Sequence, residues 1–380
     1  MKTKTIWTTA ILIALARSLP AGQVPDIVWR TNANQFGSFS VVFAPDSKSV
    51  FSYGGDAKLW RVSDRSLLRT FAIAGTEIGA VAVSPDGTRL VASAPGRFRM
   101  WRVYDGAVLH AADAYYTPGL AFSPRGDFIA RASSEGSSSV VLFSVSGGSI
   151  SNGIMYDDII SQGVNAMTFS PDGTLLLFGG SGSIAKLMRV SDGVVVQTFW
   201  HSLYVTSVAF SPNGQVIATG VHHGDVRLWS TNGTLLHTLA GTGHTTRALD
   251  FSPDGKLLVT TSRGLIQFWR VADGAHLVTY DPDPIGPATT VDIAPDGKLF
   301  AYGGGELVLA RMPLLFTEVS RAGNQLTLGW SGGSGLYQLQ STTNVVDGPW
   351  QDVGAPTAAT VTTNAVTGTI FYRVQSLPNP

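Results

Sequence analysis

The sequence contains no cysteine, so no disulfide bond can stabilise the fold and packing of the chain must do so. Charged residues are also scarce at 14% of the 380 residues, and 26 basic side chains balance 26 acidic ones. A neutral chain without basic runs lacks the electrostatic footprint of a nucleic-acid-binding protein. The sequence also has no Gly-x-Ser-x-Gly elbow and no phosphate-binding loop, so two common enzyme motifs are missing.

The start of the chain carries a short apolar run. Lys2 and Lys4 are followed by an apolar stretch that ends near Ala16, and another small residue follows at Ala21. This layout is typical of a secretory signal peptide cleaved after Ala16 or Ala21, and the run is too short to span a bilayer comfortably as an anchor. We therefore predict a signal peptide at residues 1–21, no membrane span after cleavage, and a secreted or periplasmic (cell-envelope) protein.

The most informative feature that is present is a turn motif, Ser-Pro-Asp-Gly or a close variant, which occurs seven times. Its prolines lie 40, 39, 47, 41, 41 and 42 residues apart. The seven copies, each with the apolar residue that precedes it, span residues 43–47, 83–87, 122–126, 169–173, 210–214, 251–255 and 293–297. A nearly constant period in this range is the signature of a repeat architecture.

Each repeat predicts four short strands. Proline presets the second position of a type I turn and glycine supplies a left-handed position, so the motif joins two strands. In all seven copies the residues two and four positions before the proline are apolar, as in Val41 and Phe43, which indicates a strand with one buried face. A third strand, as in Leu59–Arg61, leads through an Asp-Gly or Asn-Gly hairpin into a fourth. Four short strands per unit form the blade of a β-propeller.

These units resemble WD40 repeats. The resemblance covers roughly residues 26–312 and rests on the four-strand period, the Ser-Pro-Asp-Gly turn and the Leu-Trp-Arg strand ends. It implies an all-β fold, a seven-bladed β-propeller of a divergent bacterial type over residues 24–312. The Gly-His pair of the family survives at Gly243–His244, and Gly54, His223 and Arg263 stand where an Asp is expected. The hydrogen-bonded tetrad that the family builds around its Trp is therefore expected to be incomplete.

The last repeat lacks a fourth strand, and the beginning of the chain can supply it. No Asp-Gly hairpin follows the third strand of the seventh repeat, which is predicted at residues 306–312. A strand-like segment, Asp26–Arg30, precedes the first repeat. We predict that this segment pairs with the last blade and closes the ring, because closure removes exposed strand edges that invite aggregation.

Residues 313–380 break the period of the repeats. We predict short strands there at residues 314–319, 325–330, 336–341, 350–353, 359–362 and 369–374. Several short alternating strands predict a small β-sandwich. Through Trp330 and the strand Phe371–Val374, the segment resembles fibronectin-type-III-like modules. The resemblance implies a spacer, adhesion or sugar-binding role, of which we favour the first two.

Candidate catalytic and metal-binding groups are few. The aspartates of the repeated turns have a structural role, because a turn Asp bonds its own backbone. His222, His223 and Asp225 form a compact group of possible metal ligands in a loop between a second and a third strand, with His201 as a further candidate. The alternative is that they are exposed polar loop residues, and we predict no metal, no cofactor and no catalytic residue.

The remaining prediction is a partner-binding rim, formed mainly by the loops that lead into the first strand of each blade. In WD40-repeat proteins the equivalent places face the partner-binding side. The rim residues are Glu77, Tyr116, Asn165, Tyr204, Thr206, His222, His223, Thr245 and Arg247. Tyr and Arg are enriched at interaction hot spots, and packing of these side chains against neighbouring loops is the alternative. Extra residues in the third repeat, including Tyr156, are expected to shape the same rim.

These observations predict a non-enzymatic scaffold that binds a protein partner, of unknown identity, through this rim. The alternative is a propeller enzyme or a carbohydrate-binding protein that acts at the central mouth of the ring, for example on a cell-surface glycan. Both classes remain open because propellers host both.

Overall fold

A computed structural model describes most of the chain. The described residues are 24–32, 40–113, 119–133, 139–146, 148–151, 153–156, 163–240, 243–282, 287–322, 325–331, 337–342, 349, 351–353, 361–365 and 371–376. The predicted signal peptide lies outside them. Within this part of the chain, no helix is long and apolar enough to cross a membrane. The chain divides into two units, with the boundary between Arg311 and Met312.

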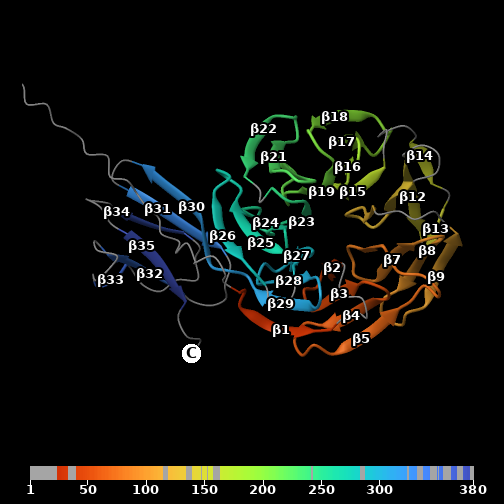
Figure 1. Ribbon diagram of the computed structural model, residues 1–380, viewed down its shortest axis with the longest axis horizontal. Helices are drawn as coiled ribbons and strands as arrows, with labels where there is room; N and C mark the ends of the chain where they lie inside the picture. Colours follow the sequence, from red (N-terminus) through yellow and green to blue (C-terminus); the bar gives the residue numbers. More distant parts are fainter. Residues whose placement is uncertain are drawn as a thin grey trace, which may run out of the picture. The chain divides into compact units, whose positions relative to one another are not determined.

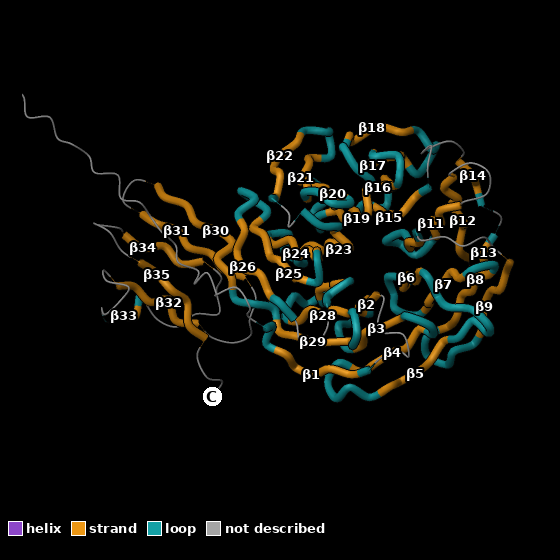
Figure 2. Tube along the Cα trace, in the orientation of Figure 1, coloured by secondary structure: helices purple, strands orange, loops and turns teal. Residues whose placement is uncertain are grey.

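The first unit is a propeller of seven antiparallel sheets, the blades, arranged around a common centre (Figure 1). Blade 1 contains β2 (Ser40–Phe43), β3 (Ser49–Tyr53), β4 (Ala57–Arg61) and β5 (Leu67–Phe71). Blade 2 contains β6 (Ala80–Val83), β7 (Arg89–Ala94), β8 (Arg97–Arg102) and β9 (Val108–Asp113). Blade 3 contains β10 (Leu120–Phe122), β11 (Phe128–Ser133), β12 (Ser139–Ser146), β13 (Ser149–Ile150) and β14 (Ile154–Tyr156). Blade 4 contains β15 (Val164–Phe169), β16 (Leu175–Gly180), β17 (Ile184–Arg189) and β18 (Val195–Trp200). Blade 5 contains β19 (Val205–Phe210), β20 (Val216–Val221), β21 (Val226–Ser230) and β22 (Leu235–Leu239). Blade 6 contains β23 (Thr246–Phe251), β24 (Leu257–Ser262), β25 (Leu265–Arg270) and β26 (His276–Tyr280). Blade 7 contains β27 (Thr290–Ile293), β28 (Leu299–Gly303), β29 (Leu307–Arg311) and β1 (Ile27–Thr31). The predicted fold class is confirmed, and Figure 2 shows the short connections between strands.

The repeated turn adopts the conformation that its residues dictate. In blade 2 the Gly87 N–H donates to the Ser84 carbonyl oxygen at 2.8 Å, and Gly87 has a left-handed φ of 68°, which favours glycine. The Asp86 carboxylate accepts the N–H of Thr88 at 3.0 Å. The same bond, at 2.8–3.1 Å, is accepted in other blades by Asp46, Asp172, Asn213, Asp254 and Asp296. These side chains therefore act in the turn itself, as the sequence predicted.

Neighbouring blades also contact each other through this turn. A Cβ placed on the turn glycine of any blade from 2 to 7 would lie 3.4–3.7 Å from the turn proline of the preceding blade. In blade 1 the glycine is replaced by Ser47, whose hydroxyl oxygen accepts the N–H of Asp296 from blade 7 at 3.1 Å. The turns therefore form a closed ring of contacts between blades.

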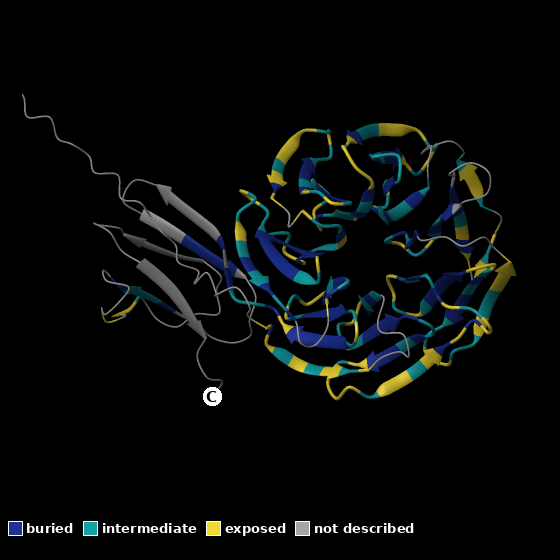
Figure 3. Ribbon diagram, viewed as in Figure 1, coloured by how far each residue is buried: buried dark blue, intermediate teal, exposed yellow. Residues whose placement is uncertain are grey.

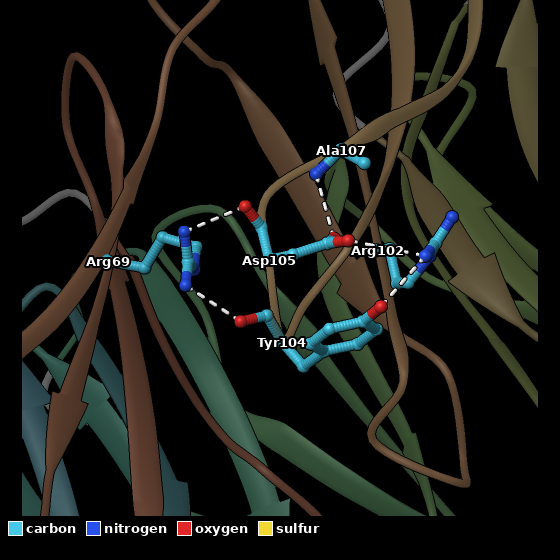
Figure 4. A network of polar contacts seen from close by, with 5 residues as sticks. All are labelled: Arg69, Arg102, Tyr104, Asp105 and Ala107. Carbon is cyan, nitrogen blue, oxygen red and sulfur yellow. Dashed lines mark hydrogen bonds and ion pairs between the residues drawn. The ribbon is translucent and has the colours of Figure 1, made fainter.

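The hairpins between third and fourth strands connect blades at the outer edge. In four of them an arginine pairs with an aspartate three residues later at 2.6–3.2 Å: Arg61 with Asp64, Arg102 with Asp105, Arg189 with Asp192 and Arg270 with Asp273. Arg69 of β5 donates to the carbonyl oxygens of Tyr104 and Asp105 in the hairpin of blade 2, at 2.7 and 2.8 Å (Figure 4). The four exposed ion pairs contribute little stability. The hydrogen bonds of Arg69 to the backbone of the next hairpin are different, because they join blade 1 to blade 2.

The core lies in the middle strands of the blades, and many exposed residues lie on the outermost strands (Figure 3). In three blades the indole N–H of a third-strand Trp donates to a hydroxyl in the second strand. These pairs are Trp60–Ser52 at 2.9 Å, Trp229–Thr219 at 2.9 Å and Trp269–Thr260 at 3.1 Å. Such a bond satisfies a buried donor that would otherwise be costly. His223 and Arg263, which stand at two places where the family has Asp, adopt left-handed φ values of 50° and 56°.

Blade 3 differs from the predicted four-strand pattern. Its third strand, β12, pairs with both β13 and β14, so this blade has five strands. Part of the longer spacing in this repeat therefore forms extra edge structure. Tyr156 was expected at the loop rim, but its ring is half-buried and lies so close to Gly193 of blade 4 that a Cβ there would come within 2.0 Å of it. Tyr156 therefore packs between blades 3 and 4. Parts of the loops around 133–139 and 150–162 lie outside the described residues.

The ring closes as predicted, through the strand near the beginning of the chain. β1 pairs antiparallel with β29 in blade 7. The Arg311 N–H donates to the Asp26 carbonyl oxygen at 2.8 Å, and the Arg311 guanidinium lies 3.0 Å from both Asp26 carboxylate oxygens. The Trp29 indole N–H donates to the Val62 carbonyl oxygen of blade 1 at 2.7 Å. β1 therefore completes blade 7 and also binds it to blade 1.

The second unit contains two three-stranded antiparallel sheets. They consist of β30 (Leu315–Ala322), β31 (Gln325–Ser331) and β34 (Val361–Ala365), and of β33 (Gln351–Asp352), β32 (Tyr337–Thr342) and β35 (Phe371–Ser376). Leu328 and Trp330 of the first sheet and Leu339 of the second are buried. All six predicted strands are present and pair into two sheets, each with buried residues.

Candidate functional site

The antiparallel strands divide the connections of the propeller between two faces. The turns from first to second strand and from third to fourth strand emerge at one end of each blade, which we call the turn face. The turns from second to third strand, and the loops from one blade to the next, emerge at the opposite end, which we call the loop face. The predicted rim belongs to the loop face.

A cluster of rings lies on the loop face of blades 5 and 6. Tyr204 precedes β19, His222 and His223 lie between β20 and β21, and His244 precedes β23. The ring centroids are 5.9 Å apart for Tyr204 and His222, 4.1 Å for His222 and His223, and 6.3 Å for His223 and His244. We call these four residues the ring cluster. Tyr204 is 49% exposed and His223 is exposed, so the cluster offers aromatic surface to solvent.

The backbone holds the ring cluster in place. The His222 N–H donates to the Tyr204 carbonyl oxygen at 2.9 Å, which joins the two loops of blade 5. His223 takes a left-handed φ of 50° in the tight turn, which turns its ring against that of His222. The His244 carbonyl oxygen accepts the Ser262 hydroxyl at 3.1 Å. Main-chain bonds therefore position these loops, and the rings extend from them.

Two further exposed apolar side chains lie at the end of blade 4, a few residues before Tyr204 in the sequence. Trp200, the last residue of β18, is 71% exposed, and Leu203 in the following loop is 37% exposed. The preceding residue, Phe199, is 1% exposed because successive strand side chains point to opposite faces. The sequence analysis did not include Trp200 or Leu203. The adjacent Phe199–Trp200 pair was the available signal, since alternation in a strand must place one of the two rings outside the core.

His201, the residue after Trp200, is more buried and has a different environment. Its ring meets the Trp229 ring edge-on, with centroids 5.6 Å apart. Burial, assisted by the nearby Arg227 cation, lowers the pKa of His201 to about 4, so the ring is neutral near pH 7. This packing separates His201 from the exposed histidines. Among the described residues, no group of three or more His, Cys, Asp or Glu side chains is arranged to hold a metal ion, so His222, His223 and Asp225 do not converge on one point there.

Comparison with known families identifies the repeats. The model of the WD domain, G-beta repeat, matches residues 159–187, 193–230 and 233–270, which cover most of blades 4 and 5 and the first three strands of blade 6. The matched units are WD40 repeats in a seven-bladed propeller. Proteins of this kind typically serve as protein-interaction scaffolds and are generally non-catalytic.

Several curated proteins share part of this WD40 propeller. Telomerase protein component 1 of Rattus norvegicus is 28% identical over 201 residues, which are 47% of this chain and 8% of that protein. An uncharacterized WD repeat-containing protein of Synechocystis is 30% identical over 144 residues, 37% of this chain and 41% of that protein. Periodic tryptophan protein 2 of Arabidopsis thaliana is 28% identical over 235 residues, 56% of this chain and 25% of that protein. The matched region therefore spans less than half the length of each of these relatives.

The other predicted rim residues of the WD40 propeller have varied environments. Asn165 donates to the Val205 carbonyl oxygen at 3.0 Å, and the Thr206 hydroxyl donates to the Thr246 carbonyl oxygen at 2.6 Å. Each of these side chains thus joins the first strands of adjacent blades, which gives both a structural role. Glu77 and Arg247 are exposed, Thr245 is half-buried, and Tyr116 lies outside the described residues. The structure therefore brings Tyr204, His222 and His223 together, whereas Glu77 lies in the loop between blades 1 and 2.

A pocket of about 510 Å³ opens beside the loop that leads from blade 6 to blade 7. It is lined by Arg263, Gly264, Leu265, Asp281 and Pro287. Arg263 and Gly264 form the tight turn between β24 and β25, where the Ala288 N–H donates to the Gly264 carbonyl oxygen at 3.0 Å. The pocket combines a guanidinium, a carboxylate and an apolar side chain, which suits a small polar ligand better than a catalytic step.

Proposed function

We propose that this WD40 propeller is an exported, non-catalytic scaffold that binds a protein partner on the loop face of blades 4 to 6. The observation that carries the proposal is the group of side chains at this end of blades 4 to 6: the ring cluster, in which Tyr204 and His223 are exposed, and the exposed Trp200 and Leu203. Trp, Tyr and Arg are the residue types that dominate interaction hot spots, and exposed Arg247 lies on the same face of blade 6. We therefore interpret this surface as a binding site for a protein partner rather than as a surface that contacts only water.

The rest of the chain suggests how the scaffold is presented. The start of the sequence has the layout of a secretory signal, which supports export to the cell envelope or beyond. Residues 312–380 belong to the second unit, and in this proposal residues 313–380 are a fibronectin-type-III-like spacer or adhesion module. The propeller then acts as the recognition module of an exported bacterial-type protein.

A ligand-binding or enzymatic propeller is the second candidate. The pocket at Arg263 and Asp281 favours it, because it offers both charges beside Leu265 in a volume that a small polar molecule or a sugar could fill. This pocket lies at the junction of blades 6 and 7, not at the ring cluster. Substitutions at the two places therefore distinguish the two functions.

The test is capture of partners from the cell-envelope fraction by the full chain and by Tyr204→Ala and Arg247→Ala variants. We expect both substitutions to reduce the yield of a specifically captured protein at least tenfold without a change in melting temperature, since hot-spot truncations are worth about 2 kcal/mol or more. Tyr104→Ala is the matched control, because Tyr104 is 72% exposed on the turn face. Equal capture by all variants would remove the loop-face assignment. Loss of glycan binding on Arg263→Ala alone would favour the second candidate.

A further inference from the structure

Two carboxylates lie on the innermost strands at the place where the ring closes. Asp250 is on β23 of blade 6 and Asp292 is on β27 of blade 7, each one residue before the apolar residue that precedes the turn. The equivalent residues of blades 1 to 5 are Val42, Ala82, Ala121, Thr168 and Ala209. Only small or uncharged side chains thus occupy this position in the other five blades.

Each carboxylate is bonded to the backbone of the next blade. The Asp250 Oδ2 accepts the Ile293 N–H of blade 7 at 2.7 Å, and the Asp292 Oδ2 accepts the Phe43 N–H of blade 1 at 2.6 Å. Since Ile293 directly follows Asp292, the first bond also brings the Asp250 carboxyl beside Asp292. The two side chains therefore form a continuous link from blade 6 through blade 7 to blade 1, which we call the inner seam.

The surroundings of the inner seam supply little to balance two negative charges. The strands packed against β23 and β27 are β2, β19, β20, β24 and β28, and Tyr302 is the one titratable residue within them. On β23 itself, Arg247 precedes Asp250 by three residues and is exposed. Burial raises the pKa of Asp292 to about 7, and burial together with the Asp292 charge raises the pKa of Asp250 well above its ordinary value. The bonds from the Phe43 and Ile293 N–H groups act in the opposite direction but do not outweigh burial.

We propose that Asp250 and Asp292 make the inner seam a pH-sensitive latch, which holds blades 6, 7 and 1 together when the pair carries at most one negative charge. In that state at least one of the two carboxyls carries a proton taken from solvent, and both backbone N–H groups keep their acceptors. When both carboxyls are ionised, the two buried charges repel each other, and separation of blades 6, 7 and 1 relieves that repulsion even though each N–H favours an ionised acceptor. The propeller is then closed most firmly in mildly acidic conditions and opens more readily at alkaline pH.

The sign of the effect follows from the protons bound. An Asp whose pKa is higher in the folded than in the unfolded chain binds more protons when folded, so its contribution to stability falls as the pH rises from about 4 to about 7. His201 has the opposite slope, because its pKa is lowered on folding and its contribution is lost as the pH falls below its ordinary value of 6.5. The latch must therefore be measured as a difference between variants.

The experiment is thermal unfolding of the full chain from pH 5 to pH 8 for the wild type, Asp292→Asn and Asp250→Asn. Asn keeps an oxygen that accepts the same N–H, but it has no charge. We expect the melting temperature of each variant, minus that of the wild type, to rise by roughly 3 °C or more between pH 5 and pH 8. Glu77→Gln, which neutralises an exposed acid, is the matched control and should show no such rise. A constant difference for both Asp variants would overturn the proposal.

Amide hydrogen exchange provides a readout that a purely structural role would not change. The protection factors of the Ile293 and Phe43 amides should fall at least threefold between pH 6 and pH 8 in the wild type and stay constant in the Asn variants. Protection of β24 amides should be unaffected in all three proteins. If the wild-type protection of Ile293 and Phe43 is independent of pH, or if the variants lose it at every pH, the carboxylates act as permanent acceptors and the latch is wrong.

Discussion

The turn face and the loop face of the propeller are made by the same seven blades, but their side chains are used differently. On the turn face, polar side chains such as Asp86 and Asp172 bond their own backbone, and Arg69 bonds the hairpin of the next blade. On the loop face of blades 4 to 6, main-chain bonds hold the loops, while Tyr204 and Trp200 extend into solvent.

This difference separates the work of building the ring from the work of recognition. A side chain that already bonds its neighbours gains little from a partner, because binding would first have to break those bonds. An exposed ring on a fixed backbone loses little conformational freedom on binding and can still bury a large apolar area. The repeated residues of the turn face therefore define the architecture, and the irregular residues of the loop face are the ones available to a partner.

The largest effect on the ring should come from removing the strand that closes it. We expect deletion of residues 24–31 to lower the melting temperature by about 10 °C or more, because β29 would lose its outer partner and the edge of blade 7 would be exposed. Thermal unfolding followed by circular dichroism measures this. Asp26→Ala, which removes only the exposed ion pair to Arg311, is the control and should change the melting temperature little. An unchanged value for the deletion would contradict ring closure by β1.

Most of the fold could be predicted from the sequence because the determining interactions are local. Proline, the turn Asp and glycine set each turn through bonds within about five residues, so seven copies specify seven hairpins. The extra pairing of β13 and β14 in blade 3 could not be predicted in this way. The spacing of 47 residues revealed additional length, but strand pairing depends on which edge that length reaches.

The site was predictable only in part, because its residues act across blades. The spacing before the turn proline located Tyr204, but the same rule selected Asn165 and Thr206, whose side chains bond the backbone of the next blade. Those bonds depend on how two repeats meet, which no single repeat contains. Asp250 and Asp292 had a visible signal, since they are carboxylates where other repeats have small residues, but their effect comes from adjacency in the closed ring.

A moderate effect should come from one turn of the turn face. Asp172→Ala removes the acceptor for the Thr174 N–H and for the Ser170 hydroxyl, and we expect a loss of about 1 kcal/mol, measured by urea unfolding at pH 7. Asp172→Asn is the matched control, because Asn213 makes the corresponding bonds in blade 5 at 3.0 and 2.8 Å. It should retain most of the stability.

The same turn gives a pH dependence of opposite sign to that of the inner seam. The hydrogen bond from Ser170, followed by that from the Thr174 backbone, lowers the pKa of Asp172. The contribution of its charge is therefore present above the ordinary pKa of 3.8 and is lost as the pH falls below it. An Asp172→Ala variant as stable as the wild type at pH 7 would contradict the structural role of the turn carboxylates.

The smallest effect on stability should come from the loop face. Trp200→Ala should change the free energy of unfolding by no more than about 0.5 kcal/mol, because the ring is 71% exposed and buries little area in the propeller. Trp229→Ala is the contrasting variant, since Trp229 is 8% exposed and bonds Thr219, and its truncation should cost about 3–5 kcal/mol. Urea unfolding of both variants measures the difference, and capture by Trp200→Ala tests recognition separately. If Trp200→Ala destabilised the chain as much as Trp229→Ala, the exposed ring would belong to the packing of the blades, and the loop face would be no freer to bind a partner than the turn face.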